Sequence, residues 1–369
     1  MSELNIAATL VSKRKEKGVT QEALANYIGV SKASVSKWET GHSYPDIVFL
    51  PQLAAYFNIS VDELINYQPQ MIKEDIRKLY IRLSKEFTEK SFDDMMKEIR
   101  ETIRKYYSCF PLLFQMGALI VNHHTLAEET NRPSLIREAM EIFLRVKSES
   151  NDFKLCKQAN LMEAACSYFL SDGAKIIELL EDSNSPMLNE CNLLSMGYAM
   201  DNQQDKANEI LQVGVYQNLL SILQNLLSLL QLEGADAEKA NTIIARITSI
   251  ADEFEVEKLH PSTMLAIYLT MAGIFVMQDD TEKALSALQK YCDLAVGSIF
   301  PIILHGDSFF DKIDGWLSEL DLGVEAPRND KTIKRSIVES VTNNPAFAAL
   351  SDHRKYKNIV GKLSAVLGG

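Results

Sequence analysis

Apolar residues recur every three or four positions along most of this chain, which is the period of an α-helix buried on one side. Segments that alternate apolar and polar residues over the length of a strand are few. Glycine and proline, which interrupt regular structure, number only 16 and 10 in 369 residues. The pattern therefore predicts an all-α protein.

Several short helices are predicted at the N-terminus, with recognisable signals at their ends. Gly18 ends the first helix, Thr20 caps a second that Gly29 closes, and Ser31 caps a third that ends before Gly41. Two short helices joined by a tight glycine-containing turn indicate a helix-turn-helix unit.

The third predicted helix has one apolar face and one small, basic face. A step of 100° per residue places Val35 and Trp38 together and turns Ala33 and Lys37 the other way. Ser60 and Glu63 form a capping box at the start of a fifth helix. The segment between the third and fifth helices is expected to form a fourth helix. Its apolar side chains are expected to join the same core: Ile47, Leu50, Leu53, Ala54 and Phe57.

The run TQEALANYIGVSKASVSKWETGHSYPDIVFLPQLAAYFNISVDELI resembles the lambda-repressor-like, Xre-type helix-turn-helix family over its whole five-helix domain. The Thr-Gln opening of the second helix, the Trp-Glu-x-Gly exit of the third and the later Leu-Ala-x-x-Phe carry the resemblance. It implies that the third helix enters the DNA major groove and that the start of the second helix meets a phosphate. It also implies an ion pair between Arg14 and Glu39.

The positions that match the family's DNA contacts fall into two groups. Lysine can donate to guanine, serine can donate or accept, and alanine can pack on a thymine methyl group, each good base contact giving about 1–3 kcal/mol of discrimination. The predicted base-reading residues are Lys32, Ala33, Ser34 and Lys37, and the predicted contacts to the DNA backbone are Gln21, Ser31, Thr40, His42 and Ser43. Lys13, Lys15 and Lys17 either approach phosphates or form a solvated helix face.

Longer helices are predicted after a linker at Pro69, and an alanine that follows a charged or polar pair recurs along them. The alanines are Ala139, Ala174, Ala207, Ala240 and Ala284, at intervals of 35, 33, 33 and 44 residues. Helix pairs with a period near 34 resemble tetratricopeptide repeats, most clearly in AGIFVMQDDTEKALSALQKY. The resemblance implies an α-solenoid with a concave inner surface.

That inner surface is expected to bind an extended peptide or a partner helix. An asparagine amide can both donate to and accept from a peptide backbone, while methionine and leucine hold side chains. The predicted ligand contacts are Asn189, Asn192, Met196, Asn225 and Leu229. The asparagines are alternatively ordinary residues of a helix surface.

Charge and composition limit the remaining possibilities. The net charge is -12, yet residues 1–40 carry six basic and four acidic side chains, which confines attraction for DNA to this end. The five cysteines include no CxxC pair, so neither a disulfide framework nor a metal site is expected. His305 and Asp307 lack a catalytic partner, and Asp307 is expected at a helix start. We expect no cofactor, no enzymatic activity, no membrane span and a cytoplasmic location.

Together these features predict a helix-turn-helix domain over residues 1–68, a tetratricopeptide-like domain over 69–297 and a helical region over 298–369. The last region, with Phe347, Leu350, Tyr356 and Ile359, either caps the solenoid or forms a dimer interface. The architecture resembles bacterial regulators that respond to peptide pheromones, and implies a homodimer that binds a double-stranded DNA operator. The alternative is a phage-type repressor whose repeats bind a regulatory protein.

Overall fold

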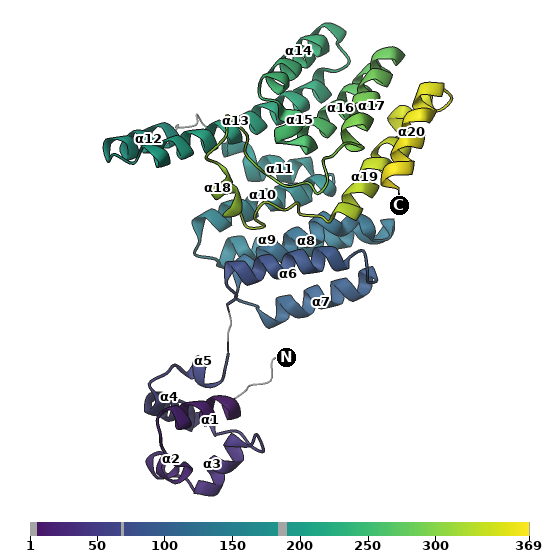
Figure 1. Cartoon of the computed structure of the whole chain (residues 1–369). Helices are drawn as coiled ribbons and strands as arrows, with labels where there is room; N and C mark the ends of the chain where they lie inside the picture. The colour runs from purple at the N-terminus through teal and green to yellow at the C-terminus, as the bar shows by residue number, and fades with distance from the viewer. Residues whose placement is uncertain (1–5, 68–69, 184–189, 369) are drawn as a thin grey trace. The chain divides into compact units, whose positions relative to one another are not determined.

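A computed structural model describes residues 6–67, 70–183 and 190–368 of the chain. Within these ranges the regular structure is helical, apart from one antiparallel β-bridge between Ile303 and Glu325. The all-α prediction is therefore confirmed (Figure 1). The predicted linker residue Pro69 and the predicted ligand contact Asn189 lie outside the described residues.

The N-terminal domain contains the five predicted helices and a short 3-10 turn, Ile47–Phe49. The helices are α1 (Ile6–Glu16), α2 (Gln21–Ile28), α3 (Lys32–Glu39), α4 (Leu50–Phe57) and α5 (Val61–Leu64). Val35 and Trp38 are buried among side chains from the other helices, as their spacing predicted. Ser60 accepts a hydrogen bond from the Glu63 amide at 3.0 Å and caps α5.

The core of this domain differs from the prediction at Ile47, whose side chain is 77% exposed. Asp46 accepts a hydrogen bond from the Val48 amide and starts the 3-10 turn, so α4 begins only at Leu50. Ile47 therefore lies outside the apolar face of α4. Leu53, Ala54 and Phe57 on that face are buried as expected, and Leu50 is partly buried.

The chain divides into two compact units by its contacts. The first comprises Met1–Ile76, Asp93–Ala118 and Arg137–Glu163, and the second comprises Arg77–Phe92, Leu119–Ile136 and Ala164–Gly369. The helices that follow the N-terminal domain are α6 (Lys73–Glu86), α7 (Phe92–Lys105), α8 (Phe110–His123), α9 (Arg132–Glu149), α10 (Phe153–Phe169) and α11 (Gly173–Leu180). They are followed by α12 (Glu190–Met200), α13 (Gln204–Glu233), α14 (Ala237–Glu253), α15 (Val256–Leu259), α16 (Pro261–Met277) and α17 (Thr281–Ala295).

Consecutive helices pack as pairs in the manner of a helical-repeat solenoid. The sequence unit AGIFVMQDDTEKALSALQKY forms the end of α16 and most of α17, where Ala272, Phe275, Ala284 and Leu288 are all buried. The recurring alanines Ala139, Ala207 and Ala240 are buried as well. Ala174 differs: it is exposed, and none of the described side chains of the short helix α11 is buried.

Helix α13 departs from the predicted helix-turn-helix period. It runs unbroken for 30 residues and joins Ala207, in the second half of one expected unit, to Asn225, in the first half of the next. Neither proline nor a glycine turn interrupts it, and Gly214 lies inside the helix against Cys191 of α12. By length and composition alone α13 is able to cross a membrane, but its buried leucines belong to the core shared with α14 and α16.

The C-terminal region contains α18 (Asp314–Ser318), α19 (Asp330–Thr342), a 3-10 segment (Pro345–Leu350) and α20 (Arg354–Leu367). Phe347, Leu350, Tyr356 and Ile359 are buried in one core with residues of α16 and α17. These side chains are thus covered within a single chain. Asp307 does not start a helix as expected; it accepts from the amides of Phe309 and Phe310, both at 2.8 Å, and caps a turn.

Candidate nucleic-acid interface

Two side-chain caps fix the helix-turn-helix. The Thr20 hydroxyl accepts from the Ala23 amide at 3.1 Å at the start of α2, and the Ser31 hydroxyl accepts from the Ser34 amide at 3.1 Å at the start of α3. Gly29, between the two helices, has a φ of 83°, a backbone angle that residues with a Cβ atom rarely adopt. Both predicted caps are therefore confirmed, and the turn that orients α3 is defined by local sequence.

Helix α3 presents a small, basic surface to solvent. Lys32, Ala33 and Lys37 are exposed, whereas Val35 and Trp38 anchor the opposite side in the core. The Lys32 ammonium lies 3.6 Å from a carboxylate oxygen of Glu22, but both side chains are largely exposed, so this pair is weak and easily exchanged for phosphate. The face predicted to read bases is accessible.

Ser34 is less available than its neighbours on this face. Its side chain is partly buried, and its hydroxyl lies 2.9 Å from the hydroxyl of Ser31, the cap residue. A contact from Ser34 to a base edge would have to replace or share that hydrogen bond. The predicted roles of Ser31 and Ser34 are therefore coupled through the helix cap.

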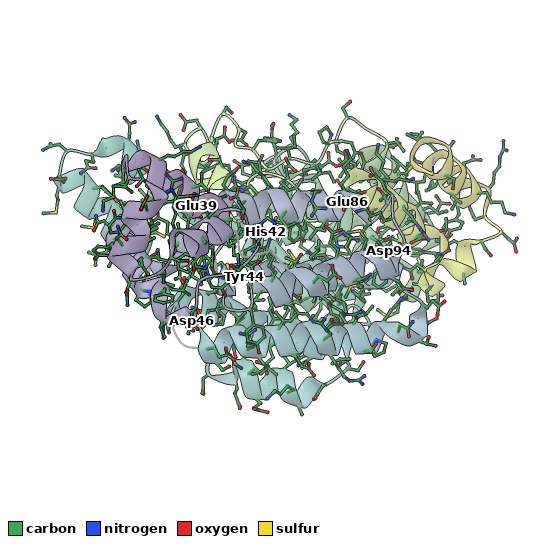
Figure 2. The ribbon with its side chains drawn as sticks, turned by 90° about the horizontal axis from the view of Figure 1, so that it is seen from below. Glu39, His42, Tyr44, Asp46, Glu86 and Asp94 are labelled. Carbon is green, nitrogen blue, oxygen red and sulfur yellow. The ribbon has the colours of Figure 1, made fainter. Side chains whose placement is uncertain are left out.

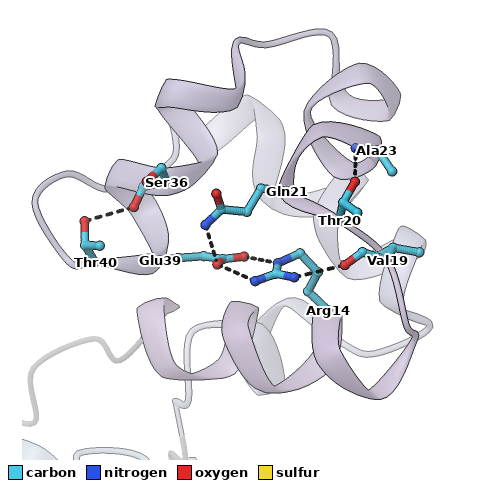
Figure 3. Close-up of polar contacts among 8 residues, drawn as sticks. All are labelled: Arg14, Val19, Thr20, Gln21, Ala23, Ser36, Glu39 and Thr40. Carbon is cyan, nitrogen blue, oxygen red and sulfur yellow. Dashed lines mark hydrogen bonds and ion pairs between the residues drawn. The ribbon is translucent and has the colours of Figure 1, made fainter.

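Arg14 and Glu39 form the ion pair that the family resemblance implied (Figure 3). The Arg14 Nε and Nη2 atoms donate to the two carboxylate oxygens of Glu39 at 2.5 and 2.9 Å, and Nη1 donates to the Val19 carbonyl at 2.9 Å. The Glu39 side chain is only 4% exposed and that of Arg14 16%. This bidentate pair ties α1 to the end of α3 and sets the angle of the exposed helix.

Gln21 joins the same cluster. Its Nε2 atom donates to Glu39 Oε2 at 2.9 Å, so the amide is engaged inside the domain as well as lying at the start of α2 (Figure 3). Its contact with the DNA backbone stays a prediction. Burial acts to raise the pKa of Glu39, but hydrogen bonds from Arg14 and Gln21 outweigh burial and the pKa is lowered, so the carboxylate stays ionised.

The sequence did not decide whether Lys13, Lys15 and Lys17 approach phosphates. Two of these three lysines contact other residues of their own domain. Lys13 lies 3.2 Å from a Glu63 oxygen and 3.6 Å from Glu16. The Lys17 ammonium donates to the Tyr56 carbonyl and lies 4.1 Å from the centre of the Tyr56 ring. These contacts hold α1 against the end of the domain and compete with any contact to phosphate.

The segment between α3 and α4 carries the remaining predicted contacts to the DNA backbone. The Thr40 hydroxyl donates to the Ser36 carbonyl at 2.9 Å, so His42 Nδ1, at 2.7 Å, is the donor to the Thr40 oxygen. Figure 2 shows His42, Tyr44 and Asp46 along this segment. Tyr44, which was not predicted as a contact, is 60% exposed, and its phenol is a suitable donor to phosphate.

The predicted ligand residues lie on two helices of the repeat region. Asn192 and Met196 are one turn apart on α12, and Asn225 and Leu229 are one turn apart on α13; all four are exposed. Cys191 of α12 contacts Gly214 of α13. Asn225 follows Gly214 by 11 residues and therefore lies about 16 Å further along the α13 axis. An extended peptide of about five residues spans that distance.

A cavity of about 840 Å³ lies elsewhere, among α14 to α17 and residues 297–305. Its lining includes Asp252, Glu257, Tyr268 and Lys290 and none of the predicted ligand residues. Sequence reasoning did not find it, because its walls come from five separate segments. Among the described residues, no three His, Cys, Asp or Glu side chains gather as a metal site.

The geometry of the N-terminal domain defines a DNA-binding protein of the helix-turn-helix class. The family model described as helix-turn-helix matches residues 10–64. The transcriptional activator BcrR of Enterococcus faecalis is 40% identical over 53 residues, which are 14% of this chain and 26% of that protein. The cryptic phage CTXphi transcriptional repressor RstR of Vibrio cholerae is 32% identical over 82 residues, 22% of this chain and 70% of that protein. The chain belongs to the Xre-type helix-turn-helix family of transcriptional regulators.

The chain thus matches only about a quarter of the length of the activator. Among solved structures, the apo form of the competence regulator ComR from Streptococcus vestibularis aligns over 86% of this chain and 98% of its own, with 14% identity and a TM-score of 0.26. A TM-score this low does not establish a shared arrangement of helices. The family assignment therefore depends on the N-terminal domain.

Proposed function

We propose that this helix-turn-helix transcriptional regulator acts in the cytoplasm as a homodimer whose repeat region senses a short peptide. The observation that supports DNA reading most directly is the exposed Lys37 on a helix that Val35, Trp38 and the buried Arg14–Glu39 pair hold in place. Two such domains in a dimer would read half-sites spaced by one helical turn of DNA or a multiple of it.

Exposed amide and apolar side chains on α12 and α13 support the sensing role. Asn192 and Asn225 offer donors and acceptors to a peptide backbone, and Met196 and Leu229 offer apolar surface one turn away. Residues 210–232 of α13 carry no charged side chain, although the whole chain has a net charge of -12. A neutral, apolar peptide fits this surface better than an acidic one.

The base-reading role of Lys37 is tested with DNA that the wild-type chain selects from a random library. Lys37→Ala should weaken binding to the selected sequence by about 1–3 kcal/mol and binding to unselected DNA much less. Lys154→Ala, an exposed lysine on α10, is the matched control and should change neither affinity. An equal loss on both DNAs would assign Lys37 to the DNA backbone alone.

The sensing role is tested by replacing both asparagines. Asn192→Ala with Asn225→Ala should abolish the effect of peptides on operator binding and leave operator binding without peptide intact. Asn241→Ala, an exposed asparagine on α14, is the control and should respond as the wild type does. An unchanged peptide titration of the double variant by calorimetry would contradict these contacts.

One observation favours a protein partner instead. Helix α12 leaves Leu193 and Met200 exposed, Met200 by 84%, and Ser195 is its one described side chain that is fully buried. Exposed apolar surface of this kind marks interaction sites. A regulator of the phage-repressor type would bind a folded protein here and ignore free peptides, which a peptide library and a two-hybrid screen distinguish.

A further inference from the structure

Residues 311–329, here called the strap, cross the second compact unit between α17 and α19 and include α18 (Figure 1). One end of the strap is fixed to α13. The Gln212 side chain donates to Asp311 Oδ1 at 2.7 Å and accepts from the Lys312 amide at 2.8 Å, and the Phe310 ring packs edge-on against Tyr216. The contact combines two hydrogen bonds with an aromatic pair.

The other end of the strap is fixed to α6 by Arg77. Its guanidinium donates to the Ser318 carbonyl at 2.9 Å, to the Asp321 carbonyl at 3.1 Å and to the Leu320 carbonyl. Ser318 is the last residue of α18, so its carbonyl lacks a partner within the helix, and the Leu320 carbonyl also accepts from the Gly323 amide at 3.0 Å. Gly323 follows at a φ of 65°, and a Cβ there would lie 3.3 Å from Arg77 Nη1, so backbone and side chain are closely fitted.

The next two turns of α6 also contact the strap. Tyr80 and Ser84 each donate from their hydroxyl groups to the Pro327 carbonyl at 3.2 Å. Asn329, which caps α19, donates from Nδ2 to the Ser84 carbonyl at 2.8 Å. Tyr80 is buried, so a hydroxyl left without its partners there would be costly.

Between the residues that contact Arg77 and the carbonyl that contacts Tyr80 and Ser84, the strap also pairs with the segment that follows α17. Ile303 and Glu325 form the β-bridge, and the Leu304 amide donates to the Val324 carbonyl at 2.9 Å. The strap therefore joins α6 and α13 to each other and to the segment that follows α17. In the described part of the chain, six further α-helices lie between α6 and α13. A shift of α13 relative to α6 requires one of these sets of hydrogen bonds to break.

The two helices joined by the strap have different places in the chain. Helix α6 is the first after the DNA-binding domain, and α13 carries the proposed effector contacts Asn225 and Leu229. We propose that the strap couples the two: it holds α6 at a fixed distance from α13, and its release at Arg77 changes operator binding. The coupling deepens, and for its effector depends on, the proposed sensing function.

The physical reason for a switch rather than a gradual change is the number of bonds that form together. Arg77 donates to three carbonyls and the Pro327 carbonyl accepts from two hydroxyls, so a displacement of the strap breaks several hydrogen bonds together. Two of the broken bonds belong to the buried residues Tyr80 and Ser84, where the loss of a partner is costly. Such an element has two discrete arrangements, bound and released, which is what coupling between distant sites requires.

The experiment uses the full chain without peptide and double-stranded DNA selected by the wild type. Arg77→Ala should raise hydrogen exchange of amides 318–329 and change affinity for the selected DNA by about fivefold or more. Arg82→Ala is the control on the same helix; Arg82 forms an ion pair with Glu86 at 2.9 Å, and its substitution should change neither quantity. Thermal unfolding by circular dichroism establishes that each variant folds.

Gln212→Ala removes both Gln212 hydrogen bonds between the strap and α13 and avoids any effect on α6 itself. The exposed Lys312–Asp205 pair and the Phe310–Tyr216 contact stay in place. The substitution should also raise exchange, at residues 311–317, and change operator affinity in the same direction. If exchange rises in either folded variant while its operator affinity equals that of Arg82→Ala, the coupling is refuted. Because no peptide is present, this result is independent of the sensing proposal; failure of every peptide to act would overturn sensing and leave the strap measurement unchanged.

Discussion

Glu39 is a carboxylate almost wholly removed from solvent, and its neighbours determine whether it stabilises the domain. Arg14 donates two hydrogen bonds to it and Gln21 a third. Removal of one member of such a pair leaves the other charge buried and uncompensated, and that cost exceeds the worth of an exposed pair. The orientation of α3 therefore depends on a residue that is buried inside the domain.

Glu39→Gln should lower the free energy of unfolding of the N-terminal domain by about 2 kcal/mol, because Arg14 loses its counter-charge. Urea unfolding at pH 7 measures the change. Glu22→Gln, which disrupts only the exposed pair with Lys32, is the control and should cost less than about 0.5 kcal/mol. Similar losses in the two variants would contradict the importance of the buried pair.

The lowered pKa of Glu39 adds a pH dependence of known sign. The unfolded chain takes up a proton near pH 4.5, while the fold resists it, so this stabilisation is complete above that pH and is lost as the pH falls further. In Glu39→Gln this part of the acid destabilisation should be absent.

His123 is a second buried titratable residue, in the second compact unit. It stacks on Phe87 with ring centres 4.3 Å apart, and its Nδ1 lies 2.9 Å from the Leu119 carbonyl. Burial lowers its pKa from 6.5 to about 4, with a smaller contribution from the nearby Arg328. The unfolded chain therefore binds a proton between these values that the folded chain does not.

As the pH falls from about 6.5 to 4, His123 should cost the fold up to about 3 kcal/mol of stability, with no further loss below pH 4. His123→Gln should remove this slope, which urea unfolding at pH 7, 6, 5 and 4.5 measures. His305→Gln, at an exposed position outside the helices, is the control and should leave the contribution of His123 in place. Parallel curves for wild type and His123→Gln would mean that the imidazole is protonated in the fold.

Close packing between α8 and α9 depends on a glycine. A Cβ at Gly117 would lie 2.8 Å from the Phe143 ring, and Phe143 is fully buried. Gly273 on α16 has open space around the same position. Comparing alanine substitutions at these two helical glycines therefore distinguishes a packing requirement at Gly117 from the general cost of glycine in a helix.

Gly117→Ala should destabilise the protein by about 1–3 kcal/mol, because Phe143 has to move within a dense core. Gly273→Ala should be neutral or stabilise by up to about 1 kcal/mol through helix propensity. Melting temperatures from calorimetry compare the two. A stabilised Gly117→Ala variant would show that the Phe143 ring can move aside at little cost, and would contradict close packing between α8 and α9.

Among the elements, those with local signals were predicted well. Thr20, Ser31 and Ser60 cap the helices they were expected to cap, because a cap depends on three or four neighbouring residues. The register of Val35 and Trp38 followed from helical geometry alone. The prediction for Ile47 was wrong because a 3-10 turn capped by Asp46 precedes α4, which begins only at Leu50. The periodicity of apolar residues does not indicate such a turn.

Other elements were not predictable from local pattern. The period of the repeated alanines suggested a break within α13, yet nothing in residues 204–233 stops a helix once it has started. The strap contacts of Arg77 join residues more than 240 positions apart and depend on the completed fold. The exposed face of α3 was predictable because one helix carries it, whereas the cavity among α14 to α17 was not.

For the whole molecule, the distribution of charge matters more than its sum. The whole chain has a net charge of -12, so attraction for DNA has to come from local groups of cations. Lys13 and Lys17 are occupied by contacts within their own domain. Lys32 and Lys37 are left as the exposed lysines of α3.

The salt dependence of operator binding should therefore be shallow. Four lysines in a dimer give a slope of log K against log salt concentration of about -4 or less steep, measured by fluorescence anisotropy between 50 and 300 mM salt. If Lys13, Lys15 and Lys17 also reached phosphates, the slope would approach about -9. The measurement decides between the two roles that the sequence left open for these lysines.

The unbroken α13 also limits how the repeat array bends. At 1.5 Å per residue its 30 residues form a rod about 45 Å long. Two successive helix pairs share this rod, so they cannot pivot against each other as they would across a flexible turn. Any bend of the array therefore has to occur outside this rod, beyond Gln204 or beyond Glu233.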